Sequence, residues 1–287
     1  MKLKETTKGR LYIISTALLF GLAGVCVKSI PWSPFSIMAA RCVFSIAIQM
    51  IGRKGRRLRF TKKNLLGAAF EAATGILYMS AIKLTTAATA IVLQYTAPIF
   101  VFLFTIVIQK RRPKRSETLI VFMVFGGCAL SFADGLDPAH VFGNLLGLLS
   151  GVTFAGQIIV FNDPSTDAED GVLLSNLFSF LICFPFWFFD KTLVFTKEAL
   201  FWIVILGVFQ YGLANFCFAR GVQKLNKVET SLLMSIEPIF NPIPVWIVTG
   251  EKMGALAMAG FVVVIAGVTV YSLLPVIEKK RRARTER

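Results

Sequence analysis

The stretch Val228–Glu251, VETSLLMSIEPIFNPIPVWIVTGE, is long and apolar enough to cross a bilayer, yet it carries a carboxylate, Glu237, well inside it. A charged side chain inside a membrane is costly and indicates a functional site by default. Prolines follow at Pro238 and Pro242, with Asn241 between them. Because proline removes a backbone donor and kinks or breaks a helix, the stretch predicts an interrupted membrane helix that faces a polar cavity.

The composition of the whole chain indicates a membrane protein. Of its 287 residues 55% are hydrophobic and only 16% are charged, and the mean hydropathy is +0.69. The charges gather between apolar runs of about twenty residues, the length that crosses a ~30 Å hydrocarbon core. We therefore expect an all-α polytopic membrane protein with ten transmembrane helices. The expected spans are Arg10–Ser29, Pro34–Ile51, Asn64–Leu84, Ala87–Gln109, Glu117–Ala133, Val141–Asn162, Gly171–Asp190, Glu198–Gly221, Glu229–Gly250 and Gly254–Leu274.

The distribution of lysine and arginine predicts the orientation. With the N-terminus in the cytoplasm, 25 of the 31 lysines and arginines fall in the termini and the cytoplasmic loops. This is the positive-inside pattern, so we expect both termini to be cytoplasmic in a multi-pass protein of the cell inner (cytoplasmic) membrane. The net charge of +15 then reflects contact with an anionic lipid leaflet and no nucleic-acid partner. One loop, Asp163–Asp170, is acidic although it should be cytoplasmic.

The two halves of the chain resemble each other. In Ala81–Phe100 and Gly221–Phe240, Pro98 aligns with Pro238 and the shared letters PIF follow. A repeat of five helices is odd in number, so its second copy must enter the membrane from the opposite side. We therefore predict two inverted five-helix repeats, residues 1–133 and 141–275, followed by a basic cytoplasmic tail, residues 276–287. Substrate sites in such proteins lie between the repeats near the midplane, and the prolines Pro98, Pro238 and Pro242 are candidate hinges.

Both halves carry small residues and a Pro-Ile-Phe motif, and the second half adds a Gly-Glu pair. The residues concerned are Arg41, Ala87, Ala90, Pro98, Ile99, Phe100, Pro238, Ile239, Phe240, Gly250, Glu251, Gly260 and Gly267. This pattern resembles the EamA family, the ten-helix branch of the drug/metabolite transporter (DMT) superfamily. The resemblance implies a transporter of small metabolites such as amino acids, often moved outward and often driven by protons. The first half departs from the pattern, with Lys110–Arg111–Arg112 where the family often has Gly-Glu.

Three charged residues inside the spans are the main candidates for the site. Glu237 lies roughly 12 Å deep and Glu71 roughly 10 Å deep from the same side, at 1.5 Å per residue. Two carboxylates at similar depth could bind a cation or carry a proton, and each could instead be a paired residue between helices. Arg41 could hold a substrate carboxylate, pair with an acid, or reach outward to the interface.

Further polar and aromatic residues are expected to line the substrate site. Intramembrane amides are costly against lipid and should face inward, where helix–helix hydrogen bonds compete with substrate contacts. Aromatic rings could hold a cation by their π-face or could instead anchor the helices at the interface. The candidates are Gln94, Tyr95, Tyr78, Gln157, Asn176, Gln210, Asn215, Asn241, Tyr211 and Trp246.

These features predict a secondary transporter of a small polar metabolite, such as an amino acid or amine, that works by alternating access. Export is the expected direction, with either a proton or the substrate gradient as driving force. We expect no cofactor, no metal site and a monomer or homodimer in the lipid bilayer. The chain has no phosphate-binding GxxxxGK[ST] motif. An intramembrane enzyme of lipid or cell-wall metabolism and a channel are the alternatives, and flux into proteoliposomes separates the three.

Overall fold

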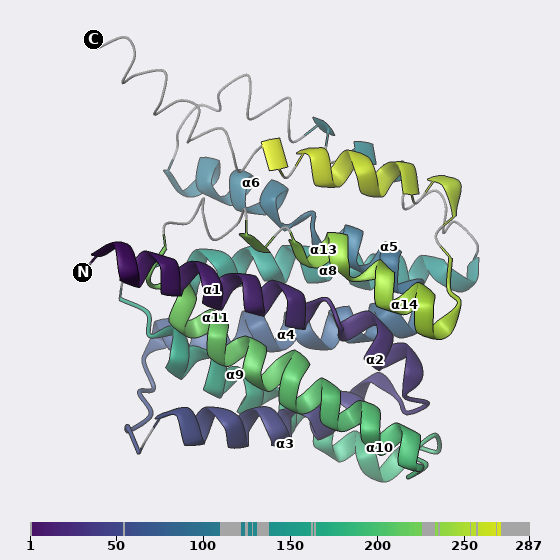
Figure 1. The fold of residues 1–287 in the computed structure, drawn as a ribbon, viewed down its shortest axis with the longest axis horizontal. Coiled ribbons are helices and arrows are strands. Elements are labelled where there is room, and N and C mark those ends of the chain that lie inside the picture. Colours follow the sequence, from purple (N-terminus) through teal and green to yellow (C-terminus); the bar gives the residue numbers. More distant parts are fainter. Residues whose placement is uncertain are drawn as a thin grey trace.

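The computed structural model describes residues 2–53, 55–109, 122–123, 126–127, 129–130, 138–161, 163, 165–225, 233–234, 236–252, 254–256, 258–267 and 269–270. In this part of the chain every regular element is a helix (Figure 1). The elements are α1 (Lys2–Phe20), α2 (Ala23–Ser29), α3 (Pro34–Arg53), α4 (Lys62–Leu84), α5 (Ala87–Gln94), α6 (Ala97–Gln109), α8 (Pro138–Phe161), α9 (Ala168–Cys183), the 3₁₀ helix η1 (Phe184–Phe189), α10 (Lys197–Val204), the π-helix η2 (Ile205–Leu213), α11 (Ala214–Val222), α13 (Ile236–Phe240) and α14 (Pro242–Thr249).

Six of the expected spans are confirmed as helices that are long and apolar enough to cross a membrane. They are Glu5–Ser29, Pro34–Arg53, Lys62–Leu84, His140–Phe161, Ala168–Phe189 and Lys197–Val222. The fourth and tenth expected spans are represented by shorter apolar helices, Ala87–Val101 and Met258–Gly267. The fifth expected span and the basic tail lie largely or wholly outside the described residues. The count of ten transmembrane helices therefore stays a prediction.

The bundle has an apolar outside and an inside rich in polar side chains. Large hydrophobic residues such as Phe188, Phe189 and Val107 are exposed, as expected of surfaces that face lipid. Buried among the helices are both acids and the arginine that the sequence places inside spans, Glu71, Glu237 and Arg41. A charge that avoids lipid in this way must be compensated by other groups inside the bundle.

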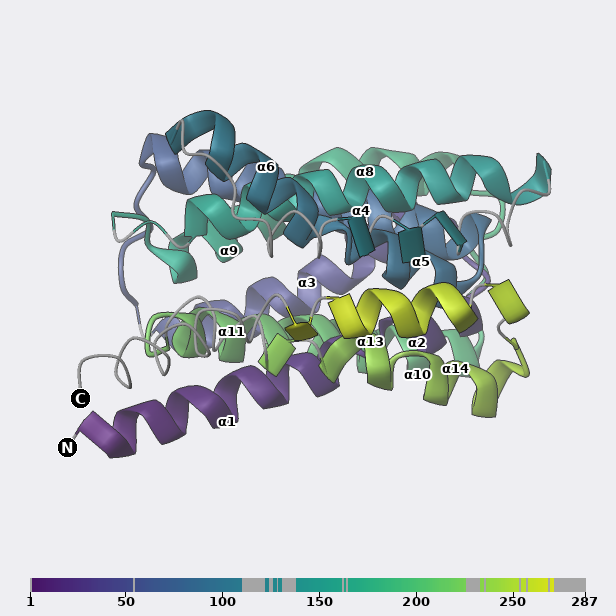
Figure 2. The same ribbon diagram turned by 90° about the horizontal axis from the view of Figure 1, so that it is seen from above.

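The two halves of the chain pack against each other over most of their length. Helix α4 contacts α8 and α9, α3 contacts η2 and α9, and α1 contacts α11. Figure 2 shows α4, α8 and α9 on one side of the bundle and α1, α10 and α11 on the other. The buried polar residues thus lie between helices from different halves.

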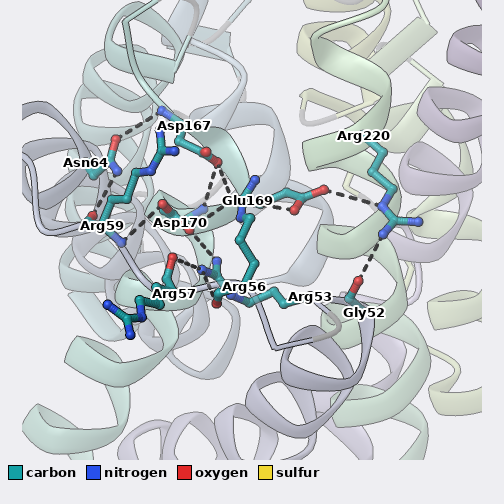
Figure 3. A network of polar contacts seen from close by, with 10 residues as sticks. All are labelled: Gly52, Arg53, Arg56, Arg57, Arg59, Asn64, Asp167, Glu169, Asp170 and Arg220. Atoms are coloured by element: carbon teal, nitrogen blue, oxygen red, sulfur yellow. Dashed lines mark hydrogen bonds and ion pairs between the residues drawn. The ribbon is translucent and has the colours of Figure 1, made fainter.

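One end of the bundle, here called the basic end, holds the start of α1 and the loop between α3 and α4 (Figure 1). There the acidic residues at the start of α9 form ion pairs with arginines at the end of α3 and in the loop that follows it, as Figure 3 shows. Asp170, fully buried, pairs with Arg53 and Arg56, and Arg56 also lies 3.0 Å from Asp167. The backbone N–H of Arg59 donates to Asp170 as well. The acids that looked misplaced by charge are therefore partners of the basic loop.

The same loop carries a second, exposed ion pair. The Lys63 ammonium lies 2.6 Å from Asp163 and also donates to the Ser165 hydroxyl. Lys63 beside it, together with the hydroxyl and N–H of Ser165, holds the pKa of the Asp163 carboxyl well below its usual range.

The opposite end, here called the Glu251 end, is closed by the corresponding pair of loops. Asp190, in the loop after η1, accepts hydrogen bonds from the Ser33 N–H and the Ser36 hydroxyl at the start of α3. The indole of Trp32 donates to the Val194 carbonyl over 2.8 Å. Each end is thus closed by one loop from each half, with charged pairs at the basic end and mostly neutral donors at the Glu251 end.

The two proline-containing segments differ in how they are interrupted. Helix α5 ends at Gln94, and Tyr95 and Thr96 form a turn before α6 begins at Ala97. Between α13 and α14, Asn241 keeps helical backbone angles and its N–H still bonds the Glu237 carbonyl at 2.9 Å. The first copy is therefore broken, whereas the described part of the second copy is a helix interrupted by a single turn residue.

Glycines on α8 let this helix approach the broken segment closely. A Cβ at Gly151 would meet the Thr96 hydroxyl and would lie 3.0 Å from the Leu93 carbonyl and 3.1 Å from that of Gln94. Pro98 has no N–H to donate to the Gln94 carbonyl, whereas the Leu93 carbonyl accepts from the Thr96 hydroxyl at 2.7 Å. The absence of a side chain at Gly151 leaves this turn room beside α8.

We expect Gly151→Ala to lower the free energy of unfolding by about 1–3 kcal/mol, because the added methyl overpacks this contact. Thermal unfolding of the detergent-purified protein measures the effect. Gly126→Ala is the control, since a Cβ there has no atom within 4 Å. Equal midpoints for the two variants would contradict the role given to Gly151.

We expect Asp170→Asn to destabilise the fold by about 3–5 kcal/mol, because it leaves the buried Arg53 guanidinium without its charge partner. The matched control is Asp163→Asn, which removes the exposed pair of the same loop and should change the unfolding midpoint little. Comparable losses in both variants would show that burial of Asp170 is not what matters.

Candidate functional site

Glu237 is held in the core by a tyrosine from the other half of the chain. It lies in α13 and is buried, and its Oε2 is 3.1 Å from the hydroxyl of Tyr95, which also lies 2.9 Å from the Met234 carbonyl. Tyr95 occupies this position because α5 ends one residue earlier and the chain turns there. The amide of Asn241 lies beside the Tyr78 hydroxyl without reaching hydrogen-bond geometry. We call Glu237, Tyr95, Asn241 and Tyr78 the Glu237 cluster.

Arg41 forms a second group with residues of α4, α9 and η2. Its guanidinium carbon lies 3.8 Å from the centre of the Tyr211 ring, a cation–π contact, and its Nε donates to the Met38 sulfur at 3.0 Å. Glu71 is close enough to act electrostatically on both Arg41 and Tyr211. With the hydroxyls of Ser175, beside Tyr211, and Ser179, beside Cys42, these residues form the Arg41 cluster.

Tyr78 joins the two clusters. Its hydroxyl is within electrostatic range of both Glu237 and Arg41, and its side chain is almost fully buried. Arg41, Glu71, Tyr78 and Tyr95 come from the first half and Glu237, Asn241, Tyr211 and the serines from the second. A continuous polar core therefore crosses the interface between the halves.

The helix that carries Tyr211 is locally widened. Residues Ile205–Leu213 form a π-helix between α10 and α11. Segments of this kind are rare and often mark functional sites. The wider turn presents Tyr211 to Arg41 and places Gln210 toward α1, where its Nε2 reaches the Phe20 carbonyl at 3.5 Å.

Many polar atoms of this core have no hydrogen-bond partner. They include Glu71 Oε2, both amide atoms of Asn241 and the hydroxyls of Tyr78, Tyr211, Ser175 and Ser179. Buried polar atoms are nearly always hydrogen-bonded, so such a concentration points to bound water or a polar ligand. In the described residues no group of three or more His, Cys, Asp or Glu side chains could hold a metal ion.

The other candidates from the sequence lie in different places. Gln94 and Gln157 are buried, in α5 and α8. Asn176 donates to the Val172 carbonyl of its own helix, which leaves its oxygen unpartnered. Asn215 lines a small cavity nearer the basic end with Gln49 and Arg220.

Trp246 and the prolines complete the list. Trp246 is 56% exposed, so the structure places it on the outside of the bundle, apart from both clusters. Pro98 lies in α6, Pro238 in α13, and Pro242 at the first position of α14. A hinge role for the three prolines stays a prediction.

Sequence reasoning missed several residues that shape the site. Ser175 and Ser179 are one turn apart on α9, and this spacing of hydroxyls in an apolar helix could have identified them. Two glycines give the clusters their space. A Cβ at Gly75 would lie 2.9 Å from Arg41 Nη2, and one at Gly24 would lie 2.9 Å from Asn241 Oδ1. Nothing in the local sequence indicates these long-range contacts.

A family comparison accounts for both halves of this arrangement. The sequence matches the EamA-like transporter family over residues 7–133 and again over residues 141–273. The chain belongs to this family. The EamA-like transporter family is part of the DMT superfamily, so the resemblance inferred from Pro98, Pro238 and the Gly250–Glu251 pair is confirmed.

Three curated relatives are also named as transporters. "Uncharacterized transporter YwfM" of Bacillus subtilis is 23% identical over 72% of each chain. An "Uncharacterized transporter" of Archaeoglobus fulgidus is 22% identical over 91% of this chain and 95% of its own. "Uncharacterized inner membrane transporter YicL" of Salmonella typhimurium is 23% identical over 98% and 99%. This EamA-like chain is thus a multi-pass membrane transporter.

A solved crystal structure shares the fold. Its TM-score is 0.64 at 17% identity, and the match covers 93% of this chain and 97% of that one. The fold of that structure is therefore shared over nearly the whole of this chain.

Replacing Asn241 separates a ligand-binding role from a structural one. Because its amide atoms have no partner, we expect Asn241→Leu to keep or raise the unfolding midpoint. Tyr95→Phe, which removes the hydroxyl shared by Met234 and Glu237, should instead lower stability by about 1–2 kcal/mol. Thermal unfolding in detergent compares the two. A large loss of stability in Asn241→Leu would mean that the amide is structural.

Proposed function

We propose that this transporter moves a small polar metabolite, such as an amino acid or amine, by alternating access around the Arg41 and Glu237 clusters. The observation that carries the proposal is the concentration of unpartnered polar atoms around buried charges between the two halves. Burying a charged or unpartnered polar side chain costs free energy, so such side chains occur inside a membrane protein mainly where they bind a substrate.

The balance of charges in the core supports coupling to a cation. Glu71 and Glu237 carry two negative charges when both are ionised, against one positive charge on Arg41. Glu71 lies near Arg41, whereas Glu237 has no cationic partner among the residues that the structure describes. A buried charge without a partner is unfavourable, and either a proton or a cationic substrate group would neutralise it.

The hydrogen bonds of Tyr95 favour a proton as one of these cations. Its hydroxyl has a single hydrogen and lies within reach of two acceptors, the Met234 carbonyl and Glu237 Oε2. If Glu237 is protonated, its carboxyl donates to the Tyr95 oxygen and Tyr95 donates to Met234, so every group is satisfied. Loss of the proton leaves two acceptors competing for one hydrogen.

The chemistry of the two clusters suggests the substrate class. An ammonium group could contact the Glu237 carboxylate and the tyrosine rings beside it, and a carboxylate could contact the Arg41 guanidinium and the serine hydroxyls. A compound with one or both groups would satisfy the unpartnered atoms. Amines and amino acids fit this description.

The arrangement of the ends supports the proposed mechanism and orientation. Each end is closed by one loop from each half, so a relative movement of the halves would open one end at a time. The basic end holds the start of α1 and the lysine- and arginine-rich loop, which favours a cytoplasmic position for this end. The name of the Salmonella relative supports an inner-membrane location. Export from the basic end toward the Glu251 end is the direction we propose.

We expect Glu237→Gln to abolish transport or to remove its dependence on a proton gradient, while expression and the unfolding midpoint are kept. Flux into proteoliposomes, with and without a pH gradient, tests this. The control is Glu198→Gln, which changes an exposed acid on α10. Transport at the wild-type rate and pH dependence in Glu237→Gln would refute the role of this acid.

The substrate can be sought with the purified protein. Amino acids, amines and nucleosides are screened for a rise in the unfolding midpoint, since a ligand that binds only the folded state stabilises it. Hits should lose their effect in Glu237→Gln or in Arg41→Gln according to whether they carry an ammonium or a carboxylate. A hit that is unaffected by both changes would bind elsewhere.

A further inference from the structure

The Gly250–Glu251 pair has a structural task that the substrate site does not explain. Gly250 has φ +72°, a left-handed conformation that glycine adopts without strain, and its N–H bonds the Trp246 carbonyl at the end of α14. This turn directs Glu251 back toward the first half of the chain. There Glu251 Oε1 accepts the N–H of Ala87 at 2.7 Å, and Oε2 lies 3.0 Å from the Lys28 ammonium.

Glu251 thereby ties three elements together at the Glu251 end. It follows α14 of the second half, Lys28 is at the end of α2, and Ala87 is the first residue of α5. Lys28 also donates to the Thr85 carbonyl at 2.7 Å, in the turn before α5. A carboxylate at the start of a helix is further stabilised by the unpaired N–H groups and the dipole of that helix.

Helix α5 is held by the second half at both of its ends. At its start Ala87 donates to Glu251, and just after its end Tyr95 contacts Glu237 and Met234. Between these contacts α5 is a continuous helix of eight residues, all of them buried. The segment α13–α14 carries Glu237 near the start of α13 and is followed by Glu251 after α14, so an acid at either end links it to α5.

We infer that the Lys28–Glu251–Ala87 contact is the latch that closes the Glu251 end, and that α5 couples this latch to Glu237. The inference rests on the proposed function, since a latch has a purpose only in a protein that opens. A proton or a substrate cation changes the contact between Glu237 and Tyr95, just after the end of α5. This change shifts α5, so that the N–H of Ala87 at its start moves relative to Glu251. Lys28 and Glu251 are then positioning residues that act on access and not on substrate.

A buried reporter cysteine tests the latch directly. Ala87 is fully buried, and its Cβ faces Gly24 of α2, since a Cβ built on Gly24 would lie 3.1 Å from it. Ala87→Cys is introduced after the five native cysteines are replaced. The rate of its reaction with a membrane-impermeant maleimide in proteoliposomes measures how often the start of α5 separates from α2 and α14.

We expect Glu251→Gln and Lys28→Gln each to raise the labelling rate about tenfold, the effect of losing a charge-assisted contact of about 1.4 kcal/mol. The control is Lys252→Gln, at the exposed neighbour of Glu251, which should label at the parent rate. Parent rates in both Glu251→Gln and Lys28→Gln would overturn the latch.

A charge exchange excludes an effect of misfolding. Glu251→Lys alone should label fastest, and the double variant Lys28→Glu/Glu251→Lys should recover part of the protection, because the ion pair is restored while the cap on Ala87 is not. A double variant that labels as fast as Glu251→Lys would overturn the ion pair as the latch. Gel filtration in detergent verifies that each variant is folded.

The coupling through α5 has its own test. Tyr95→Phe, at the opposite end of α5 from the reporter, should also raise the labelling rate at Ala87→Cys, and an unchanged rate would overturn the coupling. Flux measured on the same proteoliposomes separates this inference from the proposed function. Labelling that responds to the variants without any flux would reject the transport mechanism, and normal flux with unresponsive labelling would reject the latch.

Discussion

The structure depends on one constraint, that a charge in the membrane interior must be compensated from inside the protein. Arg41 is stacked on Tyr211, and Glu237 is bonded by Tyr95, so each charge is held by a side chain from the other half. These contacts place polar groups along the interface between the halves and apolar groups on the lipid-facing surface. Substrate binding, as proposed, uses the polar atoms that this arrangement leaves without partners.

The closure of the two ends follows a common plan with different chemistry. At the basic end, Asp170 is buried under two arginines, a contact that is costly to break. At the Glu251 end, Asp190 accepts uncharged donors and the one ion pair between the halves described there, Lys28–Glu251, is about one-fifth exposed. The Glu251 end therefore has the weaker closure, which agrees with the placement of the proposed latch there.

The interruptions of the helices serve this plan. The turn at Tyr95 ends α5 where its hydroxyl can reach Glu237, and the π-helix at Ile205–Leu213 brings Tyr211 over Arg41. Gly75 and Gly24 leave space for the Arg41 guanidinium and the Asn241 amide. These four deviations from a regular, well-filled helix lie beside one or other of the two clusters, so regular packing is relaxed there in favour of the site.

The sequence by itself determined that the chain is an all-α membrane protein, which family it belongs to and which charged residues lie in the interior. Apolar runs, prolines and charges inside those runs can be read directly along the chain. It also placed Glu237, Tyr95, Arg41 and Glu71 among the candidates. Only the tertiary structure decided which of them meet, since contacts such as Tyr95–Glu237 join residues 142 positions apart. It likewise shows that Trp246 lies on the outside of the bundle and that the acidic residues near the start of α9 pair with arginines. Glu251 contacts Lys28 and Ala87, which the sequence does not indicate. Periodicity shows that a residue is inside a span, but the packing of the other half decides what it faces.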